Sequence, residues 1–360
     1  MPARLRSLLY SVNFDDPDID LLDPLLRSVD GQPYSIWNEL DNRDIWHTNQ
    51  FIKMSGLAAN LKNRLRLVDC MTIVFICFNI LFIAFARDRI DQPLPIAAGY
   101  MACLVASLAV IAAGGPERYR PPRTKAMVII RWFQGLVRQA YPLLFLSYFF
   151  LAVTRFDNAV FAENLDPWFA AMDRAIFGSV PASWLMVRYE SCLLSELFHG
   201  AYVLYYLSIP ALAFWLHAKD REGLAEYLDV MLLLFYAACI TYVFLPVVGG
   251  RFDPAIRTLA EEYRFGPFTR IMAFIYRGTL HAGAAFPSTH ATIGLVIALV
   301  ARRRALPLAP FLAANAALIL VATVYCGYHY VVDVLAAIAY VAVLYPLTIG
   351  LHGRYGALPR

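Results

Sequence analysis

The run LPIAAGYMACLVASLAVIAAG, from Leu94 to Gly114, contains no charged residue. As an α-helix rising about 1.5 Å per residue it would reach roughly 30 Å, the thickness of a bilayer's hydrocarbon core. Apolar runs of similar length lie at 70–87, 126–153, 192–216, 225–247, 286–301, 306–325 and 328–350. This pattern predicts an all-α, polytopic membrane protein with about eight spans.

The composition agrees with this prediction. Hydrophobic residues make up 60% of the 360 residues and charged residues only 16%, whereas soluble domains are usually about half apolar and a quarter charged. The net charge of +4 is modest, and the basic residues cluster between the apolar runs, which argues against a nucleic-acid partner. The six cysteines form no CxxC pair and show no His/Cys spacing typical of zinc, so they are interpreted as small apolar core residues.

Basic loops predict the orientation in the membrane. The basic clusters are Lys62–Arg66, Arg118–Lys125, His217–Arg221 and Arg302–Arg304. With eight spans all four fall on one side, which the positive-inside rule assigns to the cytoplasm. Both termini would then be cytoplasmic, and residues 1–66 would form a cytoplasmic extension. Residues 157–185 are amphipathic and are expected to lie along the opposite interface.

The loop at 248–285 departs from the charge rule. It is predicted to lie outside, yet it contains five arginines, at positions 251, 257, 264, 270 and 277. Because positive charge is disfavoured on that side, an anion-binding site is the explanation we expect.

His329 and Asp333 are four positions apart and would share one face of a helix. A carboxylate beside an imidazole fixes its tautomer and stabilises its cationic form, which suits a nucleophilic or basic histidine. An ionisable residue inside an apolar span is also a functional candidate. The alternative is a structural pair that locks two helices together.

The segment FPSTH, residues 286–290, opens another span. Ser288 and Thr289 would lie beside free backbone N–H groups at a helix N-terminus, which is a ready anion site. From there His290 can protonate a leaving oxygen. The alternative is an ordinary capped helix start.

Gly249, Gly250 and Arg251 follow the fifth span. The paired glycines permit a close approach of the backbone, and an arginine can contact two phosphate oxygens at once. The predicted topology brings this segment, His290, His329 and Asp333 to the same membrane face.

At these residues the chain resembles the type-2 phosphatidic acid phosphatase superfamily, in particular its branch of inositol phosphorylceramide synthases. The superfamily has a basic motif ending in arginine, then Pro-Ser-x-His, then His-x-x-x-Asp. These match Arg251, the AFPSTH segment at 285–290 and the YHYVVD segment at 328–333. The segments MDRAIFG (172–178) and ELFHGAY (196–202) also look like the branch.

The resemblance implies a six-helix catalytic domain at 126–350, two accessory transmembrane helices at 67–125 and a cytoplasmic tail at 351–360. It also implies a metal-independent phosphohistidine mechanism without a cofactor. His329 would attack phosphorus, Asp333 would orient the His329 imidazole, and His290 would protonate the leaving group. The site would face the periplasm of a bacterial inner membrane, or the lumen in a eukaryote.

Two departures from the family pattern concern phosphate binding. The motif-one lysine of typical members falls at Phe244, and the third-motif arginine falls at Thr323 or Gly327. The positive charge can come instead from outer-loop residues, namely Arg277, Arg257 or His281. The missing arginine also allows a second hypothesis, that the protein is a weakly active or silent relative with a transport or scaffolding role.

Four further polar residues are candidates for structural or binding roles. Glu196 and His199 either contact a lipid head group or acceptor hydroxyl, or form a buried hydrogen-bonded pair that fixes helix packing. Asp253 and Asp173 are expected to neutralise loop arginines. The expected partners are membrane lipids, a lipid phosphate or phospholipid substrate and an alcohol acceptor. The triad alone does not separate hydrolysis from transfer to that acceptor, as in an inositolphosphotransferase.

Overall fold

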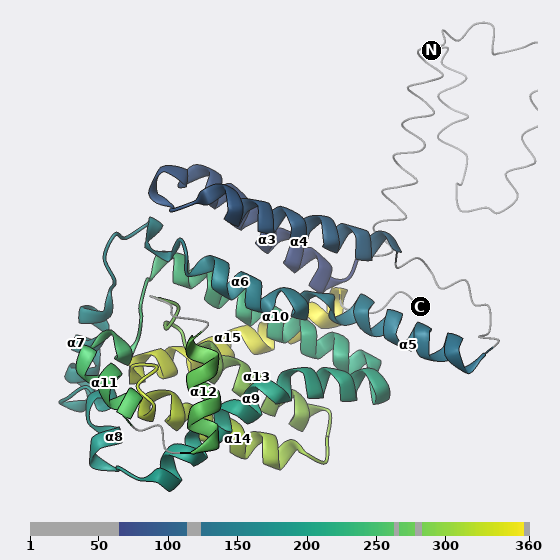
Figure 1. The fold of residues 1–360 in the computed structure, drawn as a ribbon. Helices are drawn as coiled ribbons and strands as arrows, with labels where there is room; N and C mark the ends of the chain where they lie inside the picture. Colours follow the sequence, from purple (N-terminus) through teal and green to yellow (C-terminus); the bar gives the residue numbers. More distant parts are fainter. Residues whose placement is uncertain (1–64, 114–123, 263–265, 278–282, 356–360) are drawn as a thin grey trace, which may run out of the picture. The chain divides into compact units, whose positions relative to one another are not determined.

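The computed structural model describes residues 65–113, 124–262, 266–277 and 283–355 (Figure 1). Residues 1–64, which hold nearly all of the expected N-terminal extension, lie outside these ranges. The long helices are α3 (Leu67–Phe85), α4 (Pro93–Ala113), α5 (Lys125–Ala140), α9 (Cys192–Lys219), α10 (Arg221–Phe244), α13 (Thr289–Arg303), α14 (Ala309–Tyr325) and α15 (Val331–Tyr355). The shorter ones are α6 (Leu146–Val153), α7 (Asp166–Phe177), α8 (Leu185–Arg188), α11 (Pro254–Glu262) and α12 (Pro267–Arg277). Short 3-10 turns are η3 (Arg87–Arg89), η4 (Tyr141–Phe145), η5 (Asp157–Ala159), η6 (Pro181–Ser183) and η7 (Gly250–Phe252).

Every predicted apolar run contains a helix, so the prediction of an all-α membrane protein is confirmed. Among the described residues, six helical segments are long and apolar enough to cross a bilayer. The two remaining runs form α13, of 15 residues, and α14, of 17 residues. At about 1.5 Å per residue these two helices reach roughly 22 and 26 Å, somewhat less than a full hydrocarbon core.

The third run is not one continuous helix. The α-helix α5 ends at Ala140. The chain then forms the 3-10 turn η4, and α-helical hydrogen bonding begins again with α6 at Leu146. Pro142 lies inside this turn and lacks a backbone N–H, which explains why the regular pattern is lost there.

Helix α10 is the centre of the bundle. It packs against α3, α9, α13 and α15, and 72% of its most apolar stretch is buried inside the protein. Figure 1 shows α7, α8 and α11 gathered at one end of the long helices. We call this end of the bundle the motif end, because it carries the loops 248–251 and 326–330.

At the opposite end, charged side chains join two of the basic loops. Glu226 of α10 is paired with Arg303 at 3.0 Å and with Arg304 at 2.7 Å, and Arg304 also reaches Asp220 at 3.4 Å. The loops at 217–221 and 302–304 therefore lie at the same end, as the charge pattern predicted.

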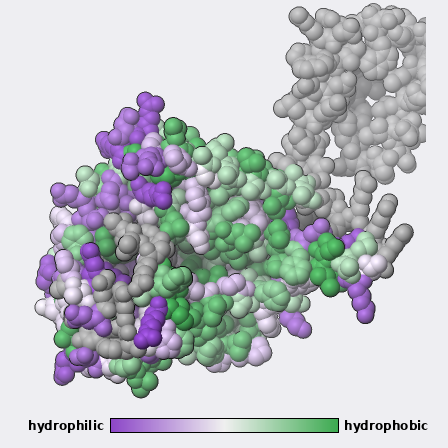
Figure 2. Space-filling model, in the orientation of Figure 1, coloured by the Kyte–Doolittle hydropathy of each residue, from purple (hydrophilic) through white to green (hydrophobic). Residues whose placement is uncertain are grey.

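The surface follows the same division. Figure 2 shows a broad hydrophobic zone across the long helices, with hydrophilic residues gathered mainly at the motif end. Strongly exposed apolar side chains include Leu81, Leu94 and Leu193, all on candidate spans. Such a surface is expected for helices that face lipid.

Candidate active site

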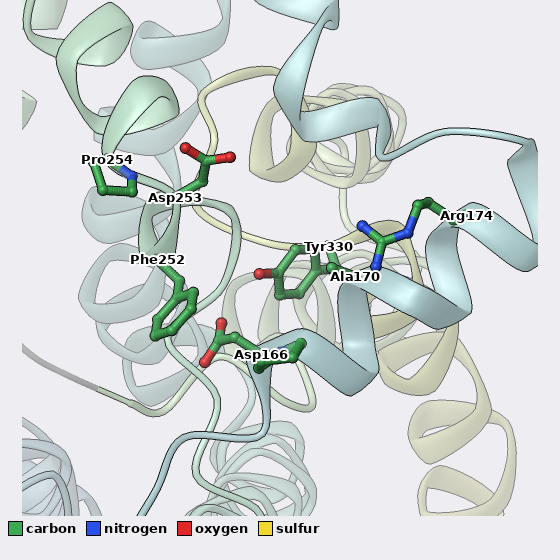
Figure 3. Close-up of a pocket in the computed structure, with 8 residues that line it drawn as sticks. Asp166, Ala170, Arg174, Phe252, Asp253, Pro254 and Tyr330 are labelled. Atoms are coloured by element: carbon green, nitrogen blue, oxygen red, sulfur yellow. The ribbon is translucent and has the colours of Figure 1, made fainter.

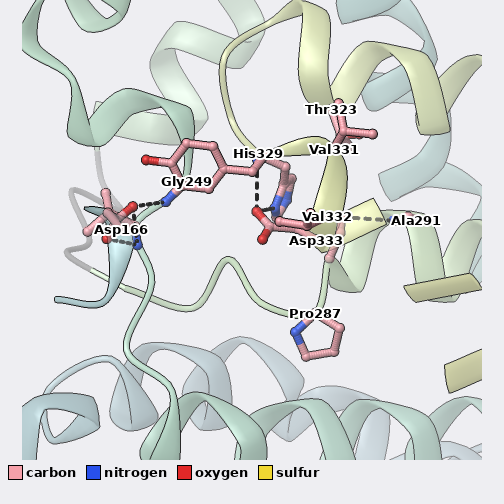
Figure 4. Close-up of polar contacts among 12 residues, drawn as sticks. Asp166, Gly249, Pro287, Ala291, Thr323, His329, Val331, Val332 and Asp333 are labelled. Carbon is pink, nitrogen blue, oxygen red and sulfur yellow. Dashed lines mark hydrogen bonds and ion pairs between the residues drawn. The ribbon is translucent and has the colours of Figure 1, made fainter. Parts of the chain in front are cut away.

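His329 and Asp333 are brought together at the start of α15. His329 Nδ1 lies 3.3 Å from Asp333 Oδ2, and the same oxygen accepts a hydrogen bond from the Tyr330 backbone N–H at 2.9 Å (Figure 4). The prediction that His329 lies on the helix is wrong. It lies in the turn before Val331, and this turn allows the pair to form because Asp333 belongs to the first helical turn.

The environment keeps His329 neutral. Its side chain is almost completely buried, and burial lowers the pKa of His329 to about 4, although a contact with the Ala285 backbone opposes this shift. A neutral imidazole that donates Nδ1–H to Asp333 carries a free electron pair on Nε2, which is the form that a nucleophile requires.

His290 lies beside this pair at the start of α13. The ring centroids of His290 and His329 are 6.0 Å apart. Ser288 is the N-cap of the helix, and its hydroxyl accepts a hydrogen bond from the Ala291 backbone N–H at 3.3 Å. Thr289, the first helical residue, is buried. The predicted helix N-terminus is therefore present and carries His290 in its first turn, with the Ser288 hydroxyl engaged as a cap.

Arg251 stands over the aromatic rings next to His329. Its guanidinium carbon lies 4.0 Å from the Tyr328 ring centroid and 5.3 Å from that of Tyr276, and these two rings stack at 4.5 Å. One guanidinium nitrogen approaches the Cys326 carbonyl oxygen at 3.4 Å. The buried Nε has no hydrogen-bond partner within the described residues, so the cation keeps donor capacity for an anion.

The paired glycines bring the first motif against the third. Gly249 has φ +91°, and a Cβ at this position would collide with the Tyr328 carbonyl oxygen. A Cβ on Gly250 would lie 3.0 Å from the Gly327 carbonyl oxygen. Only a residue without a side chain permits this contact between two backbones.

Two carboxylates of α7 hold both motif loops, and the sequence did not single out this role. Asp166 accepts hydrogen bonds from the backbone N–H groups of Val248 and Gly249 at 2.9–3.2 Å (Figure 4). Asp173 accepts those of Val331 and Val332, each at 3.0 Å. Burial raises the pKa of both carboxyl groups, and these hydrogen bonds oppose the shift.

Asp173 was expected to neutralise a loop arginine, and that expectation is wrong. The carboxylate caps α15, because the first backbone N–H groups of a helix have no partner within it. The sequence contained a partial signal. Asp166 and Asp173 are seven positions apart, so they lie on one face of α7, while Trp168 on another face is 73% exposed.

The two positions where a third-motif arginine was expected, Thr323 and Gly327, have structural roles in the backbone next to His329. The Thr323 carbonyl oxygen accepts the N–H groups of Tyr328 and His329, both at 3.0 Å. Gly327 has φ +71°, and Ile256 Cγ2 lies 2.6 Å from where its Cβ would be. A side chain at position 327 would therefore be strained and would collide with α11.

The outer-loop residues proposed as substitutes have different outcomes. The Arg257 guanidinium donates to the Arg251 carbonyl oxygen at 3.2–3.3 Å, so it supports the motif-one loop. Arg277 is the last residue of α12, and its side chain lies outside the described part of the chain, as does the whole of His281.

Glu196 and His199 are engaged separately. Glu196 accepts the backbone N–H groups of Phe268 and Thr269 at 2.9 and 3.1 Å and the Thr269 hydroxyl at 2.6 Å, so it caps α12. His199 donates from Nδ1 to the Ser195 carbonyl oxygen at 2.7 Å and is buried. The direct pair between Glu196 and His199 is therefore not formed: Glu196 binds the start of α12, and His199 bonds to the backbone of its own helix.

A cavity of about 350 Å³ opens beside the motif loops. Figure 3 shows Asp166 and Arg174 of α7 on one side, Phe252 and Asp253 on another, and Tyr330 between them. Asp253, expected to neutralise an arginine, thus lines this cavity. Among the described residues, no cluster of three or more His, Cys, Asp or Glu side chains has the arrangement of a metal site.

Comparison with known proteins agrees with this arrangement. The family model of the PAP2 superfamily matches residues 167–347, which include all three motifs and Asp173 of α7 but not Asp166. No curated protein and no solved structure matches the chain.

Proposed function

Because the chain belongs to the PAP2 superfamily, we propose that this integral membrane protein is a lipid phosphatase or phosphotransferase that uses His329 as its nucleophile. One observation carries the proposal. A buried, neutral imidazole is held by Asp333 and lies beside a second histidine at a helix N-terminus. These are the parts that covalent phosphoryl transfer needs.

In the first step, Nε2 of His329 attacks phosphorus. The bond between phosphorus and the leaving oxygen breaks, its electron pair goes to that oxygen, and His290 supplies the proton. Asp333 stabilises the positive charge that develops on His329, as a carboxylate does for a catalytic imidazole. Arg251 and the N-terminus of α13 supply positive electrostatic potential for the phosphoryl oxygens.

In the second step, water or an alcohol attacks the phosphorus of the phosphohistidine. The phosphorus–nitrogen bond breaks, its electron pair returns to Nε2, and His290 accepts the proton of the attacking oxygen. Water yields inorganic phosphate, and an alcohol yields a new phosphate ester. The same phosphoenzyme serves both reactions.

Transfer to an alcohol is the finer part of the proposal. It is supported by the likeness of residues 172–178, 196–202, 285–290 and 328–333 to the inositol phosphorylceramide synthase branch. Basic loops at the end opposite the motif loops support an outward-facing site, which is periplasmic if the membrane is a bacterial inner membrane. A silent relative is the competing proposal, supported by Gly327 in place of an arginine.

The test offers purified full-length protein in detergent a panel of lipid phosphates and phosphodiesters, with and without alcohol acceptors. Phosphate release without an acceptor identifies a phosphatase, and product formed only with an acceptor identifies a transferase. His329→Ala and His290→Ala should each abolish turnover. If the wild type is as inert as both variants, the protein is a silent relative.

A matched control is available on the same helix. His352 Nδ1 lies 2.7 Å from Asp229 Oδ2 at the other end of α15, so this pair has the same chemistry away from the motifs. His352→Ala should retain turnover per folded molecule. Equal losses in His352→Ala and His329→Ala would show that both act through folding alone.

A further inference from the structure

Tyr206 of α9 contacts His290 directly. The Tyr206 hydroxyl oxygen lies 2.9 Å from His290 Nε2. His290 Nδ1, on the other side of the ring, is buried and has no hydrogen-bond partner in the described part of the chain. The two nitrogens of this histidine therefore differ: one has a protein partner, and the other is left for a reacting group.

The surroundings of His290 are aromatic. The rings of Tyr202, Tyr205 and Tyr206 have centroids 5.0, 5.2 and 5.8 Å from that of His290. No hydrogen bond or ion pair joins this imidazole to a carboxylate among the described residues, in contrast to His329 with Asp333. The tautomer of His290 is thus set by a tyrosine hydroxyl and not by a carboxylate.

The direction of the hydrogen bond decides what His290 can do. A neutral imidazole has one donor and one acceptor nitrogen. If the Tyr206 O–H donates to Nε2, the proton of the imidazole is on Nδ1, the nitrogen that has no protein partner.

We infer that Tyr206 is a positioning residue for the general acid: it holds His290 with its proton on Nδ1 and resupplies that proton through Nε2. This inference rests on the proposed phosphoryl transfer. As the phosphorus–oxygen bond breaks, the Nδ1 proton passes to the leaving alkoxide and the Tyr206 proton passes to Nε2. The imidazole stays neutral, and the negative charge ends on the phenolate, a far weaker base than the alkoxide.

The second step restores the starting state. The attacking water or alcohol gives its proton to Nδ1, and the Nε2 proton returns to the Tyr206 oxygen. No proton is gained or lost over the cycle apart from those in substrate and product. The relay therefore needs no bulk water at the buried imidazole.

The test compares two leaving groups in purified full-length protein. Dodecyl phosphate must release an alkoxide, which requires a proton, whereas 4-nitrophenyl phosphate releases a stable anion. The value of kcat/KM reports the step in which the leaving group departs. Tyr206→Phe should lower kcat/KM about 10- to 100-fold for dodecyl phosphate, which is less than the roughly 100- to 10,000-fold of complete general-acid catalysis because His290 itself remains. For 4-nitrophenyl phosphate the loss should be less than about threefold.

Tyr202→Phe is the matched control. It removes a hydroxyl that has no partner among the described residues, and its ring lies even closer to His290 than that of Tyr206 does, at 5.0 against 5.8 Å. It should leave the ratio of the two kcat/KM values unchanged. Equal loss on both substrates in Tyr206→Phe, or the same ratio in both variants, would overturn the role of Tyr206. A wild type inert on both substrates would instead overturn the proposed function and this inference with it.

Discussion

The Asp173 carboxylate accepts the backbone N–H of Val332 at 3.0 Å, across 159 positions of the chain. The same carboxylate takes the N–H of Val331, so one side chain of α7 caps the helix that carries Asp333. The pair formed by His329 and Asp333 is therefore held in place by an element far from it in sequence.

Removal of this cap should weaken the site. Asp173→Ala leaves the buried N–H of Val332 and the partly buried N–H of Val331 without partners, at a cost of about 1–3 kcal/mol for the buried group and less for the other. Asp173→Asn keeps one acceptor oxygen. We expect a lower Tm and a lower kcat/KM in the order wild type, Asn, Ala. Thermal unfolding in detergent and turnover on a lipid phosphate measure both. An alanine variant as active as the wild type would contradict the role of the cap.

The contact between Gly249 and Tyr328 predicts a strong effect of one methyl group. Gly249→Ala places a Cβ against the Tyr328 carbonyl oxygen and also strains a residue with positive φ. Gly178→Ala is the control, because Gly178 has φ +73° but no atom within 4 Å of the added Cβ. The control should lose about 1–2 kcal/mol of stability and keep its activity. The Gly249 variant should lose activity, and equal behaviour of the two would show that the backbone contact is unimportant.

The burial of His329 predicts its titration. Since burial holds the pKa of His329 near 4, the imidazole is neutral down to about pH 5 and is protonated only as pH falls through that pKa. Its nucleophilic form is therefore lost at acid pH and not near 6.5. Titration of 15N-labelled histidines by NMR measures this, with His329→Gln to assign the signal. A midpoint near 6.5 would show that the site is more hydrated than the structure indicates.

Asp157 predicts a stability effect that depends on pH. One of its carboxylate oxygens is buried against Gly283 without a partner among the described residues, and burial raises the pKa of Asp157 to about 7. The folded state thus binds a proton more tightly than the unfolded state, and stability is lost as pH rises from about 4 to 7. Asp157→Asn should be more stable than the wild type above pH 7, by at most about 4 kcal/mol at 1.36 kcal/mol per pKa unit.

The gain from Asp157→Asn should shrink as pH falls and vanish near pH 4. Asp88→Asn serves as the control because the Asp88 side chain is 89% exposed, and its Tm should not change with pH relative to the wild type. Thermal unfolding between pH 4 and 8 tests both variants. A gain for Asp157→Asn that is the same at all pH values would mean that charge is not its cause.

Local sequence patterns predicted much of the fold. Apolar length located every long helix. The spacing of His329 and Asp333 predicted their contact, although His329 lies in the turn before α15 and not on the helix. The break at Pro142 shows the limit of such patterns, because apolar length alone does not reveal where a helix loses its hydrogen bonds.

Contacts between distant segments could not be predicted in this way. Asp166, Asp173 and Glu196 each bind backbone N–H groups more than 70 positions away, and nothing near them in the sequence indicates those partners. The spacing of motifs likewise gave no sign that Tyr206 would reach His290, because tyrosines at membrane interfaces are common.

Helix α7 also fixes the distance between the two motif loops, because it carries one carboxylate for each. Seven residues of α-helix rise about 10.5 Å and complete almost two turns, so Asp166 and Asp173 point the same way at a fixed separation. One inserted residue between them would swing one carboxylate about 100° around the axis and detach a motif loop. Helix α7 should therefore tolerate many substitutions on its exposed face but no change in the length of this interval.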